Sequence, residues 1–597
     1  HVSASFAGQT LALILWLFAT PVWAQTNDSD ALPRPVYSLY ERETIAEYLR
    51  KHKRQADETP DGKTIEAVDI VSLDVIEKRD PAPGFLNIFH VRTRKYVIRR
   101  ELLLEVGQQF RQDLADETGR NLRAITQFSL VLVFAVKGSA PDRVRLVVAT
   151  KDVWSLRLNT DFRLTPAGGF EYLVLQPSEV NLLGTQHTAA VNLLLQPETL
   201  AVGARYIIPR VGGSRILLQA ETNVVFNRET GKAEGSNGTL NYGQPLFSTR
   251  AKWSYLAKVG WKYEIDRRYV RGKLALYDAP STEAEEAIPF RYRSDILAGS
   301  YTLLRSFGIR TKHDFSMGIE ANRRVYRADD LSSYDPDAAN EFVAFALPRS
   351  DTRVGPFVQM RAYTTRFMRT IDLNTLGLQE DIRVGHDLYL RLYPVFRAIG
   401  ASRNFVGTML SASYTVPLGD GLVRGYAEGV VEAQPDRIAD ASIDVGLRVH
   451  SPRTRLGRLI ADARIFSRIR NYMNRRSVLG GDTRLRGYAT QGFFGEDVVA
   501  CNLEFRTRSI NILSVQTGAV AFWDMGDAFD GFADMQIKHG VGLGLRAVFP
   551  QFSRTAWRID WGVPLTRSAA PNGPFPGEFV LTFEQAFPLA TVPVRDF

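Results

Sequence analysis

The sequence predicts a transmembrane β-barrel of about 16 antiparallel strands preceded by a small α+β domain. Three observations indicate this fold class. From about residue 157 to the end, segments of roughly ten residues alternate apolar and polar positions between clusters of Gly, Asp, Asn and Pro. The residues before this point mix helical and strand periodicity instead. After residue 25 no apolar run approaches the ~18 residues of a spanning helix, so a membrane location requires a closed barrel.

Composition supports a folded, exported chain. Of the 597 residues, 45% are hydrophobic and 23% are charged, which excludes general disorder. The net charge of +9 comes from basic residues that alternate with apolar ones and form no block, so contact with anionic headgroups or acidic chains is favoured over nucleic-acid binding. Cys501 is the one cysteine, which rules out an internal disulfide and a cysteine-based metal site.

The first segment is predicted to be a secretory signal over residues 1–24. An apolar run at Leu11–Gln25 ends in Val22-Trp23-Ala24, a small-residue pattern that a signal peptidase accepts. The alternative is a buried N-terminal helix, which the polar residues directly after the run disfavour. No cysteine lies at the cleavage point, so we expect no lipid anchor.

Residues 25–64 are predicted to form an N-terminal segment that contains an amphipathic helix at Tyr40–Gln55, ended by "PDGKT". Residues 65–155 are predicted to form the small α+β domain, in the order strand, helix, helix, strand, strand. The segments that give this order are Ile65–Glu77, Tyr96–Phe110 with Ile98, Leu102 and Val106 at helical spacing, Asp113–Ile125, Phe128–Gly138 and Arg143–Trp154. Taken alone, the pattern also fits a soluble domain that has no partner.

Residues 156–597 are predicted to form the barrel. In "TAWRIDWGVPL", Trp557, Ile559 and Trp561 alternate with Arg558 and Asp560, and we expect the first set to face lipid and the second the lumen. A large soluble β-sandwich or propeller would also alternate, but it would then bury a core full of unpaired charges. At about 25 to 30 residues for each strand with its loop, the region holds about sixteen strands.

The stretch "LGGDTRLRGY" at Leu479–Tyr488 interrupts the strand pattern with two arginines among three glycines. A barrel of this size can hold an ordered loop in its lumen, and an arginine there needs a carboxylate. The wall offers Asp524, which shares a strand face with Phe522 and Gly526, opposite Trp523. An arginine of this stretch could therefore dock on Asp524; the alternative is an ordinary extracellular loop with a solvated arginine.

Two motifs carry a family resemblance. Leu485-Arg486-Gly487-Tyr488 is similar to the V/I-R-G-F/Y loop motif, and Phe522-Trp523-Asp524-Met525-Gly526 to the F-x-D-x-G strand motif, of the BamA/TamA-like superfamily of outer-membrane assembly and transport barrels (bacterial surface antigen type). The α+β domain resembles one POTRA module of such proteins. Three further segments resemble the family's barrel: Ser178–Gln186, Gly542–Leu565 and the last strand, Gly577–Phe587, with Gly577, Phe583 and Phe587.

The resemblance implies a lumen loop held by Arg486 and Asp524, an outer-membrane location with the N-terminal domain in the periplasm, and polypeptide clients. It also implies the lipid bilayer and accessory periplasmic lipoproteins as partners. The chain departs from the family pattern in holding a single POTRA-like domain and in continuing after Phe587 with "PLATVPVRDF". The client and the direction of transport are therefore open.

Three functions remain at this stage. The first is insertion or assembly of outer-membrane polypeptides at a weakly paired junction between the first and last strands of the barrel. The small sheet of the α+β domain has a free edge that could receive an extended client chain. The second is a secretion pore of the two-partner kind for one client, in which only the helix at Tyr40–Gln55 could serve as a plug. The third is a passive structural pore.

No enzyme is expected, because the sequence has no G-x-S-x-G, H-E-x-x-H or P-loop motif. The eight histidines never recur at metal-ligand spacing, so neither a metal nor a cofactor is expected. Arg558 and Asp560 read as a lumen-facing charge network, and His386 and His450 as wall or loop residues.

Overall fold

The computed structural model describes residues 37–78, 80, 84–125, 127–165, 169–270, 272–283, 285–481, 484–513, 515–566, 577–583 and 585. The predicted signal segment, 1–24, and Phe587 lie outside these residues. No helix in the described part of the chain is both long enough and apolar enough to cross a membrane.

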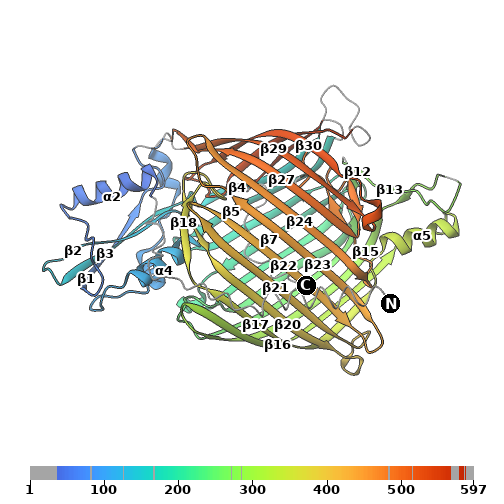
Figure 1. Ribbon diagram of the computed structural model, residues 1–597, viewed down its shortest axis with the longest axis horizontal. Coiled ribbons are helices and arrows are strands. Elements are labelled where there is room, and N and C mark those ends of the chain that lie inside the picture. Colours follow the sequence, from blue (N-terminus) through green and yellow to red (C-terminus); the bar gives the residue numbers. More distant parts are fainter. Residues whose placement is uncertain are drawn as a thin grey trace. The chain divides into compact units, whose positions relative to one another are not determined.

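The N-terminal part is a three-stranded sheet with helices on both faces (Figure 1). The central strand β3 runs parallel to β1 and antiparallel to β2. The elements follow in the order predicted from the sequence: α2 (Leu39–Lys51), β1 (Thr64–Leu73), the 3-10 turn η1 (Gly84–Phe89), α3 (Lys95–Glu101), α4 (Gln112–Arg123), β2 (Phe128–Lys137) and β3 (Arg143–Asp152).

The sheet is buried on both faces because β3 alternates between two cores. Val144 and Val148 pack with Leu122 of α4 on one face. Val147 packs on the other face with Tyr48 of α2. The helix at residues 39–51 therefore covers this sheet, where it is packed rather than available as a lumen plug.

Two local features fix α2 in place. Ser38 and Glu41 form a reciprocal capping box, in which the Ser38 N–H donates to the Glu41 carboxylate at 2.7 Å. The Tyr48 hydroxyl donates to the Asp69 carboxylate at 3.2 Å. Burial and the negative charge of Asp69 raise the pKa of Tyr48 to about 12, so α2 docks through a neutral tyrosine.

The first of the two predicted helices after β1 is shorter than the sequence pattern indicated. Leu102 and Val106 were expected to continue its helical face from Ile98, but α3 ends at Glu101 and Leu102 is extended. Val106 is 61% exposed, in the turn that leads to Gly107. Apolar spacing alone could not reveal this end, because Leu104 turns into the core from a non-helical segment.

The rest of the chain is a closed antiparallel barrel, which confirms the predicted fold class (Figure 1). Its strands are β4 (Leu156–Thr165), β5 (Gly169–Leu182), β6 (His187–Leu195), β7 (Thr199–Ile208), β8 (Leu217–Asn227), β9 (Ala233–Gln244), β10 (Trp253–Arg267), β15 (Arg291–Phe307), β16 (Thr311–Ala328), β17 (Asp351–Thr364), β20 (Gly385–Val395), β21 (Phe405–Leu418), β22 (Gly421–Ala433), β23 (Ile438–His450), β24 (Gly457–Asn471), β27 (Asp497–Thr507), β28 (Ile510–Ile512), β29 (Val515–Phe529), β30 (Lys538–Val548), β31 (Trp557–Pro564) and β32 (Glu578–Phe583).

The predicted count of about sixteen strands is wrong. Twenty-one described strands form the wall. The strands β27 and β28 pair with successive parts of the same neighbour, β29, so together they occupy one place in the wall, and the barrel has twenty strand places. The prediction allowed too much chain per strand. Several connections are short turns, such as the two residues Gly419 and Asp420 between β21 and β22.

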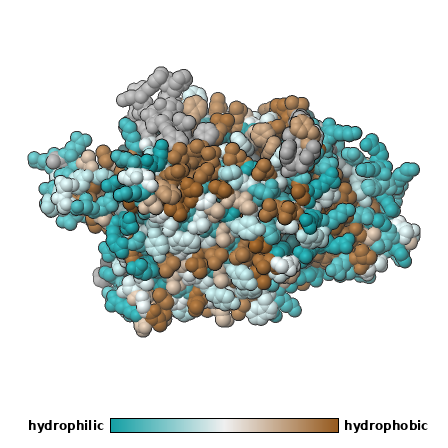
Figure 2. Space-filling view, turned by 180° about the vertical axis from the view of Figure 1, so that it is seen from behind, coloured by the Kyte–Doolittle hydropathy of each residue, from teal (hydrophilic) through white to brown (hydrophobic). Residues whose placement is uncertain are grey.

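The wall is apolar outside and charged inside. On β31, Ile559 is 44% exposed on the outer face, whereas Arg558 and Asp560 are 4% and 0% exposed. On β29, Trp523 is exposed and Asp524 is fully buried. Hydrophobic side chains gather over the barrel surface in Figure 2, with hydrophilic ones toward its ends. This inversion excludes a soluble sandwich and is the arrangement of a barrel that faces lipid.

Short elements lie in the connections at the two ends of the barrel. At the end next to the N-terminal domain they are η2 (Val211–Gly213), β18 (Phe367–Ile371) and β19 (Gln379–Arg383). At the opposite end they are β11 (Tyr269–Val270), β12 (Lys273–Leu274), β13 (Leu276–Tyr277), β14 (Ile288–Pro289), α5 (Pro336–Ala346), η3 (Arg397–Ile399), β25 (Ser477–Leu479), β26 (Phe493–Gly495) and η4 (Phe532–Asp534).

The inside-out wall predicts opposite responses at two adjacent residues of β15. Tyr301 is 47% exposed on the outer face, and Ser300 faces the lumen. We expect Tyr301→Arg to destabilise the barrel in lipid bilayers by about 2–4 kcal/mol, the cost of a cation on the lipid face. Ser300→Arg should change the unfolding free energy by less than about 1 kcal/mol, because water reaches the lumen. Urea unfolding in bilayers measures both values, and equal destabilisation by the two variants would contradict this orientation.

Candidate functional site: a buried arginine in the barrel lumen

The connection between β24 and β27, residues 472–496, is called the lumen loop here. Its centre is buried inside the barrel: Leu485, Arg486 and Tyr488 are 0%, 1% and 2% exposed. Leu485 and Tyr488 pack in one apolar cluster with Phe466 on β24 and Val498 on β27. The loop thus lies against the inner wall instead of extending into solvent.

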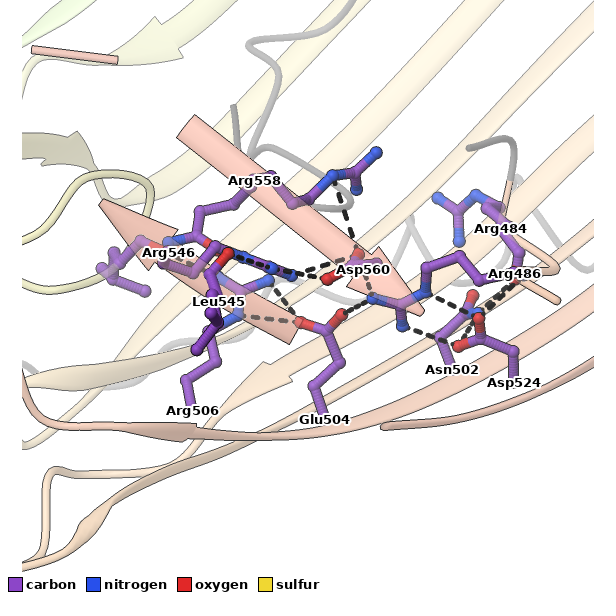
Figure 3. Close-up of polar contacts among 12 residues, drawn as sticks. Arg484, Arg486, Asn502, Glu504, Arg506, Asp524, Leu545, Arg546, Arg558 and Asp560 are labelled. Atoms are coloured by element: carbon purple, nitrogen blue, oxygen red, sulfur yellow. Dashed lines mark hydrogen bonds and ion pairs between the residues drawn. The ribbon is translucent and has the colours of Figure 1, made fainter. Parts of the chain in front are cut away.

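Arg486 pairs with Asp524 on β29 through one edge of its guanidinium, formed by Nε and Nη2 (Figure 3). Its Nε donates to Asp524 Oδ2 at 2.7 Å and its Nη2 to Asp524 Oδ1 at 2.8 Å. The backbone N–H of Arg486 donates to the same carboxylate at 3.0 Å. Asp524 therefore fixes the loop backbone as well as the side chain, a geometry that lysine cannot reproduce.

The other edge of the guanidinium reaches two more wall carboxylates. Nη1 lies 2.6 Å from Glu504 Oε1 on β27 and 3.1 Å from Asp560 Oδ2 on β31. The guanidinium carbon lies 3.5 Å from the centre of the Phe522 ring. One loop residue thus contacts three strands of the wall.

Further arginines balance the wall carboxylates. Arg506 Nε donates to Glu504 Oε2 at 2.8 Å, and Arg546 Nη1 donates to Asp560 Oδ1 at 2.5 Å. Arg558 Nε lies 3.7 Å from Asp560 Oδ2. The predicted lumen network of Arg558 and Asp560 is therefore part of a larger cluster in which buried cations and anions alternate.

The sequence did not single out four further members of this cluster: Asn502, Glu504, Arg506 and Arg546. Asn502 Nδ2 donates to Asp524 Oδ1 at 2.8 Å. Asn502, Glu504 and Arg506 are alternate residues of β27, and their burial of 1%, 1% and 5% identifies the inner face. A search for polar residues at alternate positions near the wall motif could have found them.

Gly487 is required by the closeness of the loop to the wall. Its φ is +94°, in the region that glycine adopts readily. A Cβ there would lie 2.8 Å from the carbonyl carbon of Gly562 on β31. Tyr488 follows with its hydroxyl donating to the His539 carbonyl at 2.6 Å. Gly526, the last residue of the wall motif, leaves room for the loop in the same way, since a Cβ there would lie 3.1 Å from Leu479.

The predicted terminal-strand residues lie elsewhere. Gly577, with φ of +102°, precedes β32 and approaches Gly562 on β31. Phe583 is the last residue of β32, and Phe587 lies outside the described residues. The strand that Gly577 precedes, β32, also contacts β4 and so closes the barrel; this contact is called the seam below. Gly577 and Phe583 do not contact the Arg486 cluster through any hydrogen bond or ion pair recorded among the described residues.

Among the described residues, the seam has the fewest registered backbone pairs of the wall junctions. Among the described residues, β32 and β4 share one registered pair, Leu581 with Phe162. The neighbouring junctions share more: six registered pairs join β31 to β32, and ten join β4 to β5. In the described part of the chain, fewer backbone pairings therefore close the barrel here than at the two adjoining junctions.

A second inward segment, which the sequence did not indicate, lies at the end next to the N-terminal domain. Residues 365–384, called the inner hairpin here, contain β18 and β19. Their tip crosses to other parts of the wall: the Thr375 hydroxyl donates to the Arg554 carbonyl at 2.6 Å, and Arg506 donates to the Leu373 carbonyl at 2.9 Å. Leu376 and Leu378 pack with Val548 and Ala556. The hairpin and the lumen loop thus occupy the barrel interior from opposite ends.

The inner hairpin also joins the N-terminal domain. Arg123 at the end of α4 donates to Asp381 through Nε at 2.6 Å, and Arg369 Nη2 donates to Asp116 at 2.8 Å. Burial would raise the pKa of Asp381, but Arg123 and Arg369 outweigh it and hold that pKa below its usual range. The hairpin is therefore tied by charge to α4 on one side and to the wall on the other.

The described residues contain no group of three or more His, Cys, Asp or Glu side chains that could hold a metal ion. The Arg486 cluster pairs arginines with carboxylates and a single amide. Such a cluster holds the loop against the wall through charge-assisted hydrogen bonds.

Comparison with known proteins leaves the family open. No family model and no curated protein matches the chain. Among solved structures, BamA from Haemophilus ducreyi lacking POTRA domains 1–3 is 11% identical with a TM-score of 0.32, over 92% of this chain and 94% of that one. CdiB from Escherichia coli is 12% identical with a TM-score of 0.38, over 88% and 75%. The FrpB iron transporter from Neisseria meningitidis is 10% identical with a TM-score of 0.35, over 92% and 98%.

Removing Arg486 is expected to release the lumen loop. Arg486→Ala leaves Asp524 buried and short of the two hydrogen bonds that the guanidinium donates, a loss of about 3–5 kcal/mol in docking free energy, while the barrel still inserts. The matched control is Arg484→Ala, which removes a less buried arginine that pairs with Asp462. Protease cleavage within residues 472–496 measures how much of the lumen loop is undocked. A shift in electrophoretic mobility on heating shows that the barrel is folded. Equal protection of both variants and the unchanged protein would rule out this role for Arg486.

Shortening the inner hairpin is expected to open the lumen. Replacing residues 372–378 with a two-residue Asn-Gly turn removes Leu373, Thr375, Leu376 and Leu378 from the wall. Single-channel conductance in planar bilayers should rise above that of the unchanged protein. The control replaces the turn 434–437 at the opposite end of the barrel. If the hairpin variant conducts no better than this control, the hairpin does not restrict the lumen.

Proposed function

We propose that the protein is an outer-membrane barrel that assists the insertion, assembly or translocation of polypeptides, with its N-terminal domain in the periplasm. Residues 65–155 act in this proposal as a POTRA-like domain. The motifs around Arg486 and Asp524 resemble those of the BamA/TamA-like superfamily, and the contacts of these two residues agree with that resemblance.

The observation that carries the proposal is the seam. Among the described residues one registered pair joins β32 to β4, so the edges that these two strands turn toward each other are the ones an incoming strand would pair with. The lumen loop pairs with β27, β29 and β31, and none of its Arg486 contacts crosses the seam. The seam can therefore separate while the Arg486 cluster keeps the adjoining wall in shape.

The lumen beside the seam has room for a chain segment. A cavity of about 1230 Å³ is lined by residues of β4–β8 and by the end of α4, including Arg157, Gln176, Arg205 and Arg123. Its lining mixes apolar side chains with several arginines, so it offers both apolar and polar contacts to an extended polypeptide.

The N-terminal sheet supplies a second strand edge. Residues 55–57 pair along part of the outer edge of β2, and residues 107–110 pair with the start of β1. The remainder of β1 is the outer strand of this sheet, next to β3 alone among the described strands. An extended client, or an accessory periplasmic lipoprotein, could add to this edge through backbone hydrogen bonds.

A disulfide across the seam tests this function. In a Cys501→Ser background, Phe162→Cys with Leu581→Cys joins the one registered pair of the seam. The control, Leu543→Cys with Trp561→Cys, joins a registered pair of β30 and β31. We expect the seam pair alone to lower the amounts of many outer-membrane barrels in cells depleted of the unchanged protein, and a reductant to restore them.

The proteome of the depleted cells distinguishes the alternatives. Loss of one secreted protein would favour a two-partner secretion pore, and an unchanged outer-membrane proteome would favour a passive pore. The packing of α2 on the N-terminal sheet removes the plug helix that the secretion alternative needs. A seam disulfide that forms and leaves the amounts of client barrels unchanged contradicts lateral insertion.

A further inference from the structure

Arg305 is a charged residue on the lipid-facing side of the barrel. It lies in a row of residues that face one another across five strands: Trp253, Arg305, Phe315, Met360 and Leu390. Its outward neighbours on β15, Leu303 and Phe307, are 37% and 47% exposed. An arginine on such a face is costly unless an anion meets it.

Aromatic rings hold the Arg305 guanidinium, and no acidic side chain does so within the described residues. The guanidinium carbon lies 4.7 Å from the centre of the Trp253 ring and 5.3 Å from that of Phe307. Stacking on the ring faces leaves the N–H groups at the guanidinium edge directed away from the rings. These donors are suited to a phosphate in fork geometry.

Arg305 lies at the depth in the membrane where lipid headgroups lie. It lies two residues before the end of β15, beside the turn Gly308–Arg310, and the Arg310 carbonyl accepts a hydrogen bond from Thr365 at the start of the inner hairpin. Arg305 is therefore at the membrane boundary next to the N-terminal domain. Lys252 and Arg310 are exposed at the same end and add positive charge.

An apolar groove of about 360 Å³ runs from Arg305 along the outer wall. Two registered rows form its floor, and the second row contains Leu303, Met317, Val358 and Leu392. The groove is lined by Trp253, Leu303, Arg305, Phe315, Ser316, Met317, Val358, Gln359, Met360, Leu390 and Leu392. Its apolar lining and its position on the lipid face suit an acyl chain.

We propose that this surface is a binding site for an anionic phospholipid in the leaflet next to the N-terminal domain. The Arg305 guanidinium binds the phosphate, Lys252 and Arg310 supply further attraction, and one acyl chain lies in the groove beneath. Charge decides between anionic and zwitterionic lipids, because each basic residue near a membrane surface favours the anionic lipid. The site requires only that the barrel spans a membrane, so it is independent of the client and of the seam.

Native mass spectrometry of the full chain in detergent tests the site. The probes are phosphatidylglycerol and phosphatidylcholine with the same acyl chains. We expect the unchanged protein to prefer phosphatidylglycerol and Arg305→Gln to lower that preference about fivefold, the factor expected from the loss of a single basic residue. The matched control is Arg293→Gln, an exposed arginine at the other end of β15, which should keep the preference.

A second variant tests the groove without changing the charge. Met317→Trp fills the groove, so it should weaken phosphatidylglycerol binding although Arg305 remains. An excess of inorganic phosphate should not displace the lipid if the acyl chain contributes. Equal binding of the two lipids by the unchanged protein, an unchanged preference in Arg305→Gln, or displacement by inorganic phosphate would each overturn the proposal.

Discussion

The architecture depends on one buried cation inside a closed wall. A guanidinium that is 1% exposed is stable only where carboxylates surround it, and Arg486 has three of them, on β27, β29 and β31. Because those strands are neighbours in the wall through β30, the arginine fixes the loop and also holds this part of the wall in one geometry. The apolar packing of Leu485 and Tyr488 then follows from where Arg486 must lie.

The stabilising contacts are unevenly distributed around the barrel. The lumen loop and the inner hairpin both dock on the wall from β24 to β31, where buried arginines and carboxylates alternate. Among the described residues, the seam between β32 and β4 has one registered pair, and a large cavity lies beside it. A barrel built in this way is rigid in one region and weakly closed in another, and that difference is the physical basis of the proposed function.

The sequence predicted what alternation and short motifs encode. Period-two patterning separated Trp523 from Asp524 and Ile559 from Asp560 correctly. The pairing of Arg486 with Asp524 was implied by the family resemblance of the two motifs and supported by the need of a buried arginine for a carboxylate. The sequence did not reveal Glu504 as a second acceptor for Arg486. Nor did it reveal the inner hairpin, because the hairpin's contacts join residues far apart in the chain: Thr375 and Arg554 are separated by 179 residues. The strand count was wrong because turn lengths vary, and α3 ended early because tertiary packing of Leu104 overrode helical spacing.

The measurement that tests the central claim most directly is a double-mutant cycle between the loop and the wall. The variants are Arg486→Met, Asp524→Leu and the double variant. The quantity measured is the free energy of docking of the lumen loop in bilayers, calculated from the fraction of the protein whose loop is accessible to protease. If the buried pair holds the loop, the double variant will be more stable than the sum of the single losses by about 2 kcal/mol or more. Additive losses, with a coupling energy near zero, would show that Arg486 and Asp524 act independently and that the loop is held by something else.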